Sequence, residues 1–306
     1  MPESTTDLRN TRRAVVGTGL RRPALRSAVL CSNLRRIGLH AITIAILAFL
    51  LLPVYQMVVT SLKPGVDAWS LPPDIWPRRF TFDHFRTIWA IVPRLPLYLR
   101  NSLLYGFGVS AISLAIGIPS AYGLTRYTLK IRGAVLMALI YANMFAPIML
   151  LVPLQETMRA FGLNNTMAGM IVSGALFTTP FSTWLFVAYF HTIPREIDES
   201  GLVDGARRFT VLMRLVLPLI GPAIVAVAVY AFITGWSQQF QLALVLIQDD
   251  RLMPVTQGLY QFFARSSVRW TELMAAAFVT TLVPFTMFFA VQRYLVSGMT
   301  AGSVVK

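Results

Sequence analysis

Acidic and basic residues gather in one interior segment of this chain, between His191 and Pro218, with long apolar stretches on either side. Three acidic side chains follow soon after Pro194, which suits the first turn of a helix because its missing N–H is not needed there. Acids at this end are stabilised by the helix dipole, so the sequence predicts a short helix here. The three are Glu196, Asp198 and Glu199.

Gly205 interrupts this first helix, and a second amphipathic helix is expected after it. Pro218 ends or kinks the second helix. Its apolar residues recur at the i, i+3, i+4, i+7 spacing. They are Phe209, Leu212, Met213 and Val216. Two short helices that meet at a glycine form a knob able to dock in a groove, so the chemistry predicted for this segment is binding.

Residue patterns typical of nucleotide binding, nucleophilic catalysis and metal binding do not occur in the sequence. There is no G-x-x-x-x-G-K-[ST], no G-x-S-x-G and no H-E-x-x-H. The single cysteine, Cys31, excludes an intramolecular disulfide and a thiolate cluster. The three histidines are far apart and are His40, His84 and His191. We therefore expect no catalytic residue, no metal and no cofactor in this chain.

Composition places most of the chain in a lipid bilayer. Of 306 residues, 56% are hydrophobic and 13% are charged, which is far from a soluble domain. A spanning helix needs roughly 20 apolar residues, and six intervals without Asp, Glu, Lys or Arg can each hold one. They are Ile37 to Leu62, Asn101 to Thr125, Gly133 to Gln155, Ala160 to Pro194, Leu215 to Gln248, and Leu273 to Gln292. The predicted fold class is an all-α membrane protein with six transmembrane helices.

The predicted spans contain no acidic or basic residue, although ion-coupled carriers usually keep one at depth. An internal energy source is therefore not expected, and a force that drives uphill transport would have to enter at the charged segment. Two alternatives stay open at this point. A self-sufficient secondary carrier or channel would transport without a partner, and an intramembrane enzyme would need a reactive pair at depth, which the spans do not supply.

The basic residues predict the orientation in the membrane. If the N-terminus is cytoplasmic, 17 of the 27 Lys and Arg residues fall on the cytoplasmic side and 10 fall outside. The positive-inside rule then places both termini and the segment from Pro194 to Pro218 in the cytoplasm. Residues 1–36 are Arg-rich without periodicity, and we expect a disordered tail beside anionic lipid headgroups. The net charge of +14 is thus explained without a nucleic-acid partner.

The charged segment resembles the EAA loop of the transmembrane subunits of bacterial ATP-binding-cassette (ABC) importers. That loop reads E-A-A, three residues, G, nine residues, and then I-x-L-P. Glu199, Ser200 and Gly201 occupy the first block, Gly205 falls in register, and L-V-L-P closes the motif at the right distance. Ser200 and Gly201 replace the two alanines, and Leu215 replaces the isoleucine. Because glycine weakens a helix by about 1 kcal/mol relative to alanine, Gly201 is expected to affect the detail of docking.

Shorter matches extend the resemblance over about Ile37 to Lys306. They are Thr60 to Pro64, Asn101 to Leu103, Pro153 and Leu154, Gly162 and Leu163, Asn165 and Thr166, Gly235 to Phe240, and Gln292 to Gly302. In one of them, Gln239 stands where relatives commonly have glutamate. Together the matches are similar to the carbohydrate-uptake permeases of the MalG type.

This resemblance implies a type I ABC importer permease with the MetI-like fold, multi-pass in the bacterial plasma membrane. Residues 37–306 would form the permease domain, and residues 191–218 its cytoplasmic coupling loop. The implied partners are a second homologous permease, an ABC ATPase dimer that binds ATP and Mg, and an extracytoplasmic substrate-binding protein. The residues implied to couple to the ATPase are Glu199, Ser200, Gly201, Asp204, Gly205, Ala206 and Pro218.

A pathway for a sugar or a related polyol would use polar and aromatic groups within the spans, because amides meet sugar hydroxyls while an aromatic face covers the C–H surface. The candidates are Asn143, Trp236, Gln238 and Gln239. Hydrogen bonding to neighbouring helices is the alternative for each of them. In relatives, the external loop before the last span reaches into the binding protein. That implies a contact by Asp249, Asp250 and Arg251, although a charged external loop is often only solvated.

Overall fold

The computed structural model describes residues 22–65, 67, 75–77, 79–263 and 269–301, and this part of the chain contains helices and no strand. Two units, Met1–Gln56 and Met57–Lys306, are distinguished by their internal contacts. The first unit contains most of helix α1 (Arg22–Ser61), whose side chains from Arg36 to Tyr55 are exposed. The helix begins within the stretch 1–36 that was expected to be disordered, because arginine is a good helix former. Residues 1–21 of that stretch lie outside the described residues.

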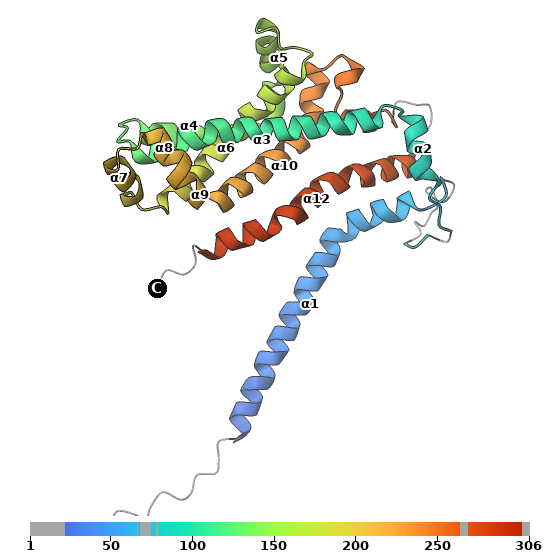
Figure 1. Cartoon of the computed structure of the whole chain (residues 1–306). Coiled ribbons are helices and arrows are strands. Elements are labelled where there is room, and N and C mark those ends of the chain that lie inside the picture. Colours follow the sequence, from blue (N-terminus) through green and yellow to red (C-terminus); the bar gives the residue numbers. More distant parts are fainter. Residues whose placement is uncertain (1–21, 66, 68–74, 78, 264–268, 302–306) are drawn as a thin grey trace, which may run out of the picture. The chain divides into compact units, whose positions relative to one another are not determined.

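The second unit is a bundle in which α3, α6 and α10 pack on one another, as Figure 1 shows. Helix α12 packs on α10 and on α2. The helices of this unit are α2 (Asp83–Ile91), α3 (Leu95–Arg126), α4 (Arg132–Ala142), η2 (Pro147–Leu150), α5 (Leu151–Ala160), α6 (Met167–His191), α7 (Glu196–Val203), α8 (Arg208–Val211), η3 (Leu212–Val216), α9 (Leu217–Leu219), α10 (Gly221–Leu246), η4 (Asp250–Leu252), α11 (Val255–Tyr260) and α12 (Trp270–Ala301).

The crossing of α3 and α6 depends on a missing side chain. A Cβ atom added at Gly174 of α6 would lie 2.3 Å from Oη of Tyr105 and 2.7 Å from Cγ2 of Val109, both on α3. Small residues let membrane helices approach closely, so that van der Waals contact replaces the hydrophobic drive that lipid cannot supply. The glycine therefore sets the distance between these two helices.

Five described helices are long and apolar enough to cross a membrane, and a sixth span requires a bent pair. The five are Arg36–Ser61, Leu95–Arg126, Met167–His191, Gly221–Leu246 and Trp270–Gln292. The interval Gly133 to Gln155 was expected to hold one continuous helix, and this prediction was wrong. It breaks into α4 and an η2–α5 segment at an angle of 96°. Ala146 is extended because the residue before a proline, here Pro147, disfavours helical geometry.

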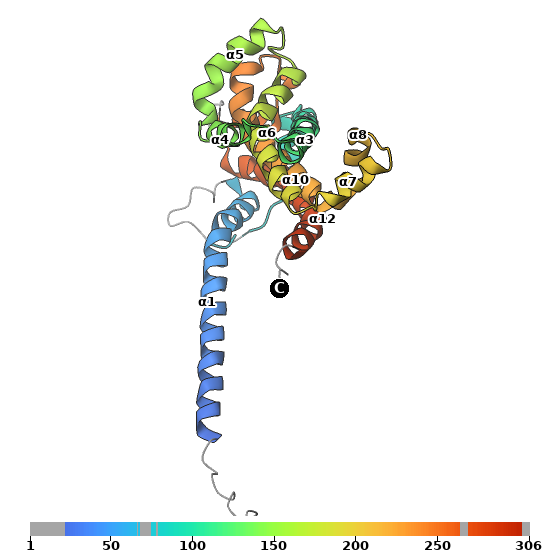
Figure 2. The ribbon, with the colours of Figure 1, turned by 90° about the vertical axis from the view of Figure 1, so that its left-hand side faces the viewer.

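The expected fourth span also begins later than its uncharged interval, at Met167 instead of Ala160. Thr166 explains this start, because its side chain accepts a hydrogen bond from the backbone N–H of Gly169 and caps the helix. At one end of the bundle, the C-terminal end of α3 lies beside α7, α8 and α9, while α2 lies at the other end (Figure 1). Figure 2 shows α4 and α5 on one side of the bundle and α7 and α8 on the other.

Candidate functional site

The charged segment folds into two short helical parts joined by a tight turn. Helix α7 begins at Glu196, which confirms the predicted start, and Gly205 has a positive φ of 80°. The N–H of Gly205 donates to the carbonyl of Leu202, and the N–H of Ala206 donates to the carbonyl of Gly201, each at 3.0 Å. These two bonds form a Schellman motif, in which glycine adopts the left-handed conformation at no steric cost. The turn direction is therefore fixed by Gly205.

The part after the turn differs from the amphipathic α-helix that was predicted. Leu212–Val216 form a π-helical turn, which adds a residue to the repeat and shifts the buried face. As a result Phe209 and Met213 are exposed, at 70% and 39%. Leu212 and Val216 are buried as predicted, and Val211 is buried in addition.

Gly201 lies where α7 crosses this second part. A Cβ atom there would lie 2.6 Å from Cδ1 of Leu215 and 3.0 Å from Cγ2 of Val211. From the sequence, Gly201 was expected only to weaken the helix. In the structure, its missing side chain makes room for Leu215. The glycine and the leucine, which depart from the EAA pattern separately, thus fit each other in space.

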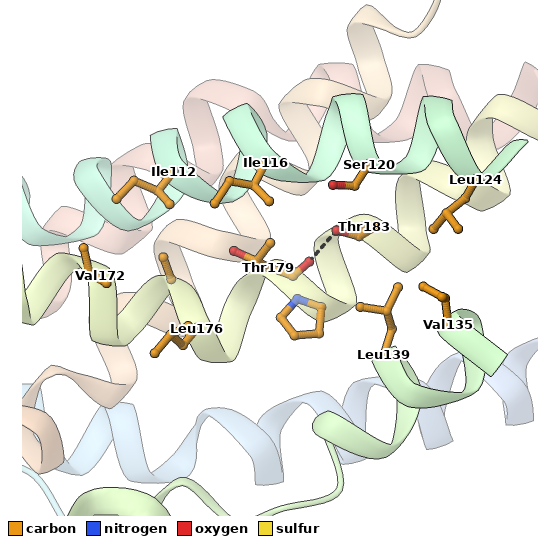
Figure 3. A pocket seen from close by; sticks show the side chains of 12 residues that line it. Ile112, Ile116, Ser120, Leu124, Val135, Leu139, Val172, Leu176, Thr179 and Thr183 are labelled. Atoms are coloured by element: carbon orange, nitrogen blue, oxygen red, sulfur yellow. Dashed lines mark hydrogen bonds between the residues drawn. The ribbon is translucent and has the colours of Figure 1, made fainter. Parts of the chain in front are cut away.

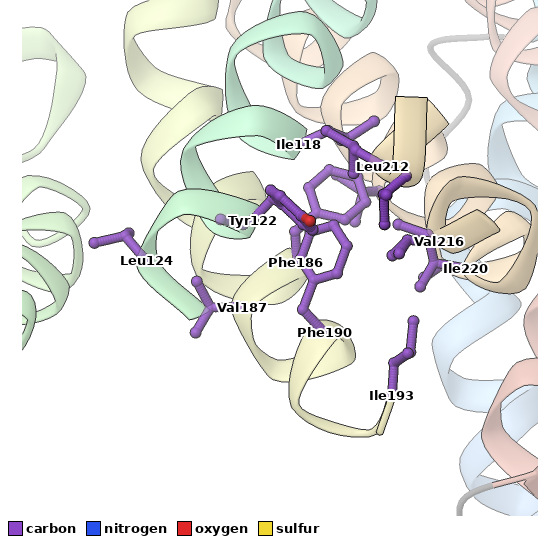
Figure 4. Close-up of a cluster of buried hydrophobic side chains, with 14 residues drawn as sticks. Ile118, Tyr122, Leu124, Phe186, Val187, Phe190, Ile193, Leu212, Val216 and Ile220 are labelled. Atoms are coloured by element: carbon purple, nitrogen blue, oxygen red, sulfur yellow. The ribbon is translucent and has the colours of Figure 1, made fainter. Parts of the chain in front are cut away.

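The charged segment, residues 191–218, is joined to the bundle by a hydrophobic cluster (Figure 4). Val211, Leu212 and Val216 from the loop belong to one buried cluster with Tyr122 of α3 and Phe186 of α6. Burial of each large side chain contributes about 1.5 to 3 kcal/mol, so the loop is held to α3 and α6 by several such contributions. The loop is therefore part of the core and is not a flexible connection.

The surface of this loop combines charge with two large apolar side chains. Val203 is 86% exposed and Phe209 is 70% exposed, and neither was among the predicted coupling residues. Of those residues, Glu199, Ser200, Asp204, Gly205 and Pro218 are exposed, Ala206 is half-buried, and Gly201 is buried. A sequence signal for Val203 and Phe209 did exist, since each is a large apolar residue next to the turn at Gly205.

The predicted pathway residues do not form one cluster of polar groups. Asn143 ends α4, is exposed, and donates from Nδ2 to the carbonyl of Leu139 at 2.9 Å. Trp236 of α10 stacks near Phe232, with ring centroids 5.8 Å apart. Gln239 is fully buried, and neither atom of its amide has a hydrogen-bond partner among the described residues.

Hydrogen bonding to neighbouring helices, the alternative considered for these residues, therefore does not explain the buried amide of Gln239. The carbonyl oxygen of Gln238 is also buried without a partner in the described part of the chain. An unsatisfied buried polar group costs about 1 to 3 kcal/mol. Two adjacent residues of α10 thus place buried polar atoms where no described protein group satisfies them.

The loop between α10 and α11 is held by side chains of α3 and of Arg94, which directly precedes it. Asp250 pairs with Arg94 and accepts a hydrogen bond from the phenol of Tyr98. The amide of Asn101 donates to the carbonyls of Arg251 and Met253 at 2.8 and 3.0 Å. Of the three predicted contact residues, Asp249 and Arg251 are exposed, whereas Asp250 is engaged within the protein.

A second anchor of this loop is Asn165, whose side-chain oxygen accepts from the N–H groups of Gln248 and Asp249, each at 2.8 Å. Asn165 has a positive φ of 57°, which asparagine tolerates better than most residues. The loop is consequently held in one shape from both sides, and only its outer side chains are available to another molecule.

A lateral cavity of about 400 Å³ lies between α3, α4 and α6 (Figure 3). Its lining is apolar except for three hydroxyl side chains, and one of these, Thr183, donates to the carbonyl of Thr179 at 2.9 Å. None of the four predicted pathway residues lines it. The cavity is therefore largely apolar and does not have the lining of a sugar site.

Residues 113–301 match the family described as "Binding-protein-dependent transport system inner membrane component". This chain belongs to that family. It is 32% identical to the inner membrane ABC transporter permease protein YcjP of Escherichia coli, over 89% of this chain and 97% of the relative. It is 30% identical to the sulfoquinovosyl glycerol permease SmoH of Agrobacterium fabrum, over 83% and 88% of the two chains.

Among solved structures, a bacterial ABC transporter involved in the import of the polysaccharide alginate superposes with a TM-score of 0.68. Sequence identity is 19%, and the match covers 90% of this chain and 99% of that one. The fold is thus the all-α, MetI-like fold of ABC importer permeases, as predicted. Family membership makes this chain a non-catalytic, multi-pass membrane subunit of a transport system. It also decides against the self-sufficient carrier and the intramembrane enzyme.

Proposed function

We propose that this chain forms half of the solute pathway of an ATP-driven carbohydrate importer and receives mechanical work through the coupling loop. One observation carries the proposal. The loop presents an exposed surface of acidic and apolar side chains, including Glu199, Asp204, Val203 and Phe209, while its other face is built into the core. A surface patch with a rigid base suits a groove on a moving partner.

The proposed partner at this surface is a dimer of ABC ATPases, which would bind ATP and Mg in their own subunits. A second homologous permease would complete the pathway, and a substrate-binding protein would deliver the solute from outside. Closure of the ATPase pair would displace the coupling loops as rigid bodies and switch the pathway between the two faces of the membrane. Asp249 and Arg251 are the proposed contacts to the binding protein, because they are the two exposed residues among the three predicted contacts.

This mechanism requires the coupling loop and both termini to face the cytoplasm, with lipid around the bundle. An orientation test uses Arg207→Cys in a Cys31→Ser background, since Arg207 is exposed on the loop. A membrane-impermeant maleimide should label it in inside-out vesicles and leave it unlabelled in intact spheroplasts. Labelling in spheroplasts instead would place the loop outside and end the proposal.

The coupling role is tested at Gly205 with two substitutions of equal shape. A Cβ atom at Gly205 would meet no atom within 4 Å, and asparagine and aspartate both tolerate a positive φ. Gly205→Asp adds a negative charge to the proposed docking surface, and Gly205→Asn does not. Equal membrane levels of both variants, with uptake lost in the aspartate variant alone, are expected. Equal uptake by both would show that this surface does not dock.

The carbohydrate assignment is supported by the similarity to SmoH, a sulfoquinovosyl glycerol permease, and to the transporter for the polysaccharide alginate. The chain, co-expressed with an ATPase, a second permease and a binding protein encoded beside it, would be reconstituted in liposomes. Sulfoquinovosyl glycerol, an alginate trisaccharide and trehalose serve as probes, with methionine as the non-sugar control. ATP-dependent uptake of a sugar is expected, and uptake of methionine alone would contradict the assignment.

The proposed pathway residues are tested at Gln239, where stability and transport should move in opposite directions. Gln239→Leu removes a buried amide without partners, so the free energy of unfolding should rise by about 1 to 3 kcal/mol. If this amide binds solute, uptake should fall at the same time. A stabilised variant with normal uptake would remove Gln239 from the pathway.

A further inference from the structure

Arg126 and Asp198 form an ion pair inside the protein. Arg126 is the last residue of α3, and Asp198 lies in the first turn of α7. Nε of the arginine lies 2.9 Å from Oδ2 of the aspartate, and the two side chains are only 6% and 8% exposed. The contact is a charge pair without the alignment of a hydrogen bond. The other carboxylate oxygen accepts from the phenol of Tyr122 at 2.6 Å.

Two hydrogen bonds connect the same two regions, one donated by Arg126 and the other by Arg195. Arg126 donates from Nη2 to the carbonyl of Ile193, before α7, at 3.2 Å. Arg195, at the start of α7, donates from Nη2 to the carbonyl of Thr125, near the end of α3, at 3.1 Å. The base of the coupling loop is therefore bonded to α3 on both sides of the ion pair.

A buried ion pair is not needed to hold these elements together. Apolar residues of similar volume are often as stabilising, because the desolvation of two charges offsets their attraction. The hydrophobic cluster of the loop already supplies such contacts. What a buried pair adds is a fixed geometry, since one charge cannot move away without leaving the other unpaired in a dry site.

We propose that the Arg126–Asp198 pair makes α7 and the C-terminal end of α3 one rigid unit, so that displacement of the coupling loop is passed directly to α3. Covalent connection alone would pass it to α6 and α10, which precede and follow the loop. The pair is thus a positioning device for coupling. This inference rests on the proposed function.

The first test is Asp198→Asn, which keeps an acceptor for Tyr122 and removes the charge. In the reconstituted complex, ATP hydrolysis should persist, while the number of solute molecules taken up per ATP hydrolysed should fall about tenfold. A tenfold effect is typical of the free energy that couples two sites in a protein. Asp198→Glu should restore part of the coupling. The matched control is Glu196→Gln, an exposed acid on the same helix, which should leave the ratio unchanged. If Asp198→Asn lowers membrane levels, Tyr122→Phe keeps the charge pair and should give a smaller loss of coupling.

A cross-linking experiment tests rigidity without disturbing the pair. The guanidinium of Arg208 lies 4.9 Å from the ring centre of Tyr127, and both residues are exposed. Cysteines at these two positions, in a Cys31→Ser background, can be joined by a bismaleimide and compared with the same variant before joining. A rigid unit predicts that joining leaves at least half of the uptake. Uptake abolished by joining would show that the loop must move relative to α3.

Different results would count against the proposed function and against the rigid unit. No ATP-driven sugar uptake by the unaltered complex counts against the proposed function. Sugar uptake by the unaltered complex, together with full coupling in Asp198→Asn, counts against the rigid unit alone.

Discussion

Restoring alanine at position 201 gives the sharpest test of how the coupling loop is packed. Alanine is the residue that the EAA pattern has there, and in an isolated helix it should stabilise by about 1 kcal/mol over glycine. The structure predicts the opposite result. A Cβ atom at Gly201 would lie 2.6 Å from Cδ1 of Leu215 and 3.0 Å from Cγ2 of Val211, both closer than ordinary contact.

The size of the effect follows from which neighbour can move. Leu215 is 39% exposed, so the end of its side chain can rotate outwards. Val211 is fully buried and β-branched, and its side chain has few other rotamers. Overpacking typically costs about 1 to 3 kcal/mol, which exceeds the gain in helix propensity. Gly201→Ala should therefore lower the free energy of unfolding by roughly 1 kcal/mol.

A second substitution separates packing from propensity. Leu215→Val removes the atom nearest to the new methyl group and should by itself cost roughly 0.5 kcal/mol, because the leucine is only partly buried. Combined with Gly201→Ala it should return the stability to about that of the unaltered protein. The implied coupling of about 1 to 1.5 kcal/mol lies within the range measured for residues in contact.

Unfolding of the four proteins by SDS in mixed micelles, followed by tryptophan fluorescence, would measure this cycle. The control is Gly123→Ala in α3, where a Cβ atom would meet no atom within 4 Å. Its effect should be stabilising and should add to that of Leu215→Val. Additivity of the Gly201 and Leu215 effects within about 0.5 kcal/mol would refute the packing argument. So would stabilisation by Gly201→Ala as large as that by Gly123→Ala.

Three further substitutions test other close contacts. Gly205→Ala should cost about 1 to 2 kcal/mol in the same unfolding assay, because alanine is strained at a φ of 80°, and asparagine there should cost less. Asn101→Leu removes two hydrogen bonds to the external loop, each contributing about 1 kcal/mol, and should speed proteolysis of that loop in right-side-out vesicles. Gly174→Ala would place a Cβ atom 2.3 Å from Oη of Tyr105 and should reduce the amount of folded protein in the membrane, whereas Gly133→Ala, at an open position, should not.

The spans could be predicted because a long uncharged interval has few structural solutions in a bilayer. The same argument cannot find a bend within such an interval. Pro147 was visible in the sequence, but apolar composition on both of its sides concealed that the chain turns by 96° there. For a similar reason only Leu212 and Val216 of the face predicted after Gly205 are buried, since a π-helical turn moves the buried face without changing which residues are apolar.

The buried ion pair lay beyond prediction because its partners are 72 positions apart in the sequence. Arg126 follows directly after an uncharged interval, where the positive-inside rule treats it as a headgroup contact. In the structure it points into the protein, towards Asp198. Pairing of this kind depends on how α3 and the loop pack in three dimensions. Within this loop the turn at Gly205 and the start of α7, which depend on local backbone chemistry, were predicted correctly, and so was the burial of Leu212 and Val216.

The packing of the second unit bears on where the proposed transport motion can occur. The coupling loop is joined to α3 by the Arg126–Asp198 pair and to α3 and α6 by the hydrophobic cluster. The crossing at Gly174 holds α3 and α6 so closely that sliding would drive Tyr105 into the backbone of α6. A displacement entering at α7 therefore cannot be absorbed between these helices. In the proposed importer it would move them together, so that the pathway would open and close between this subunit and the proposed second permease and not within the subunit.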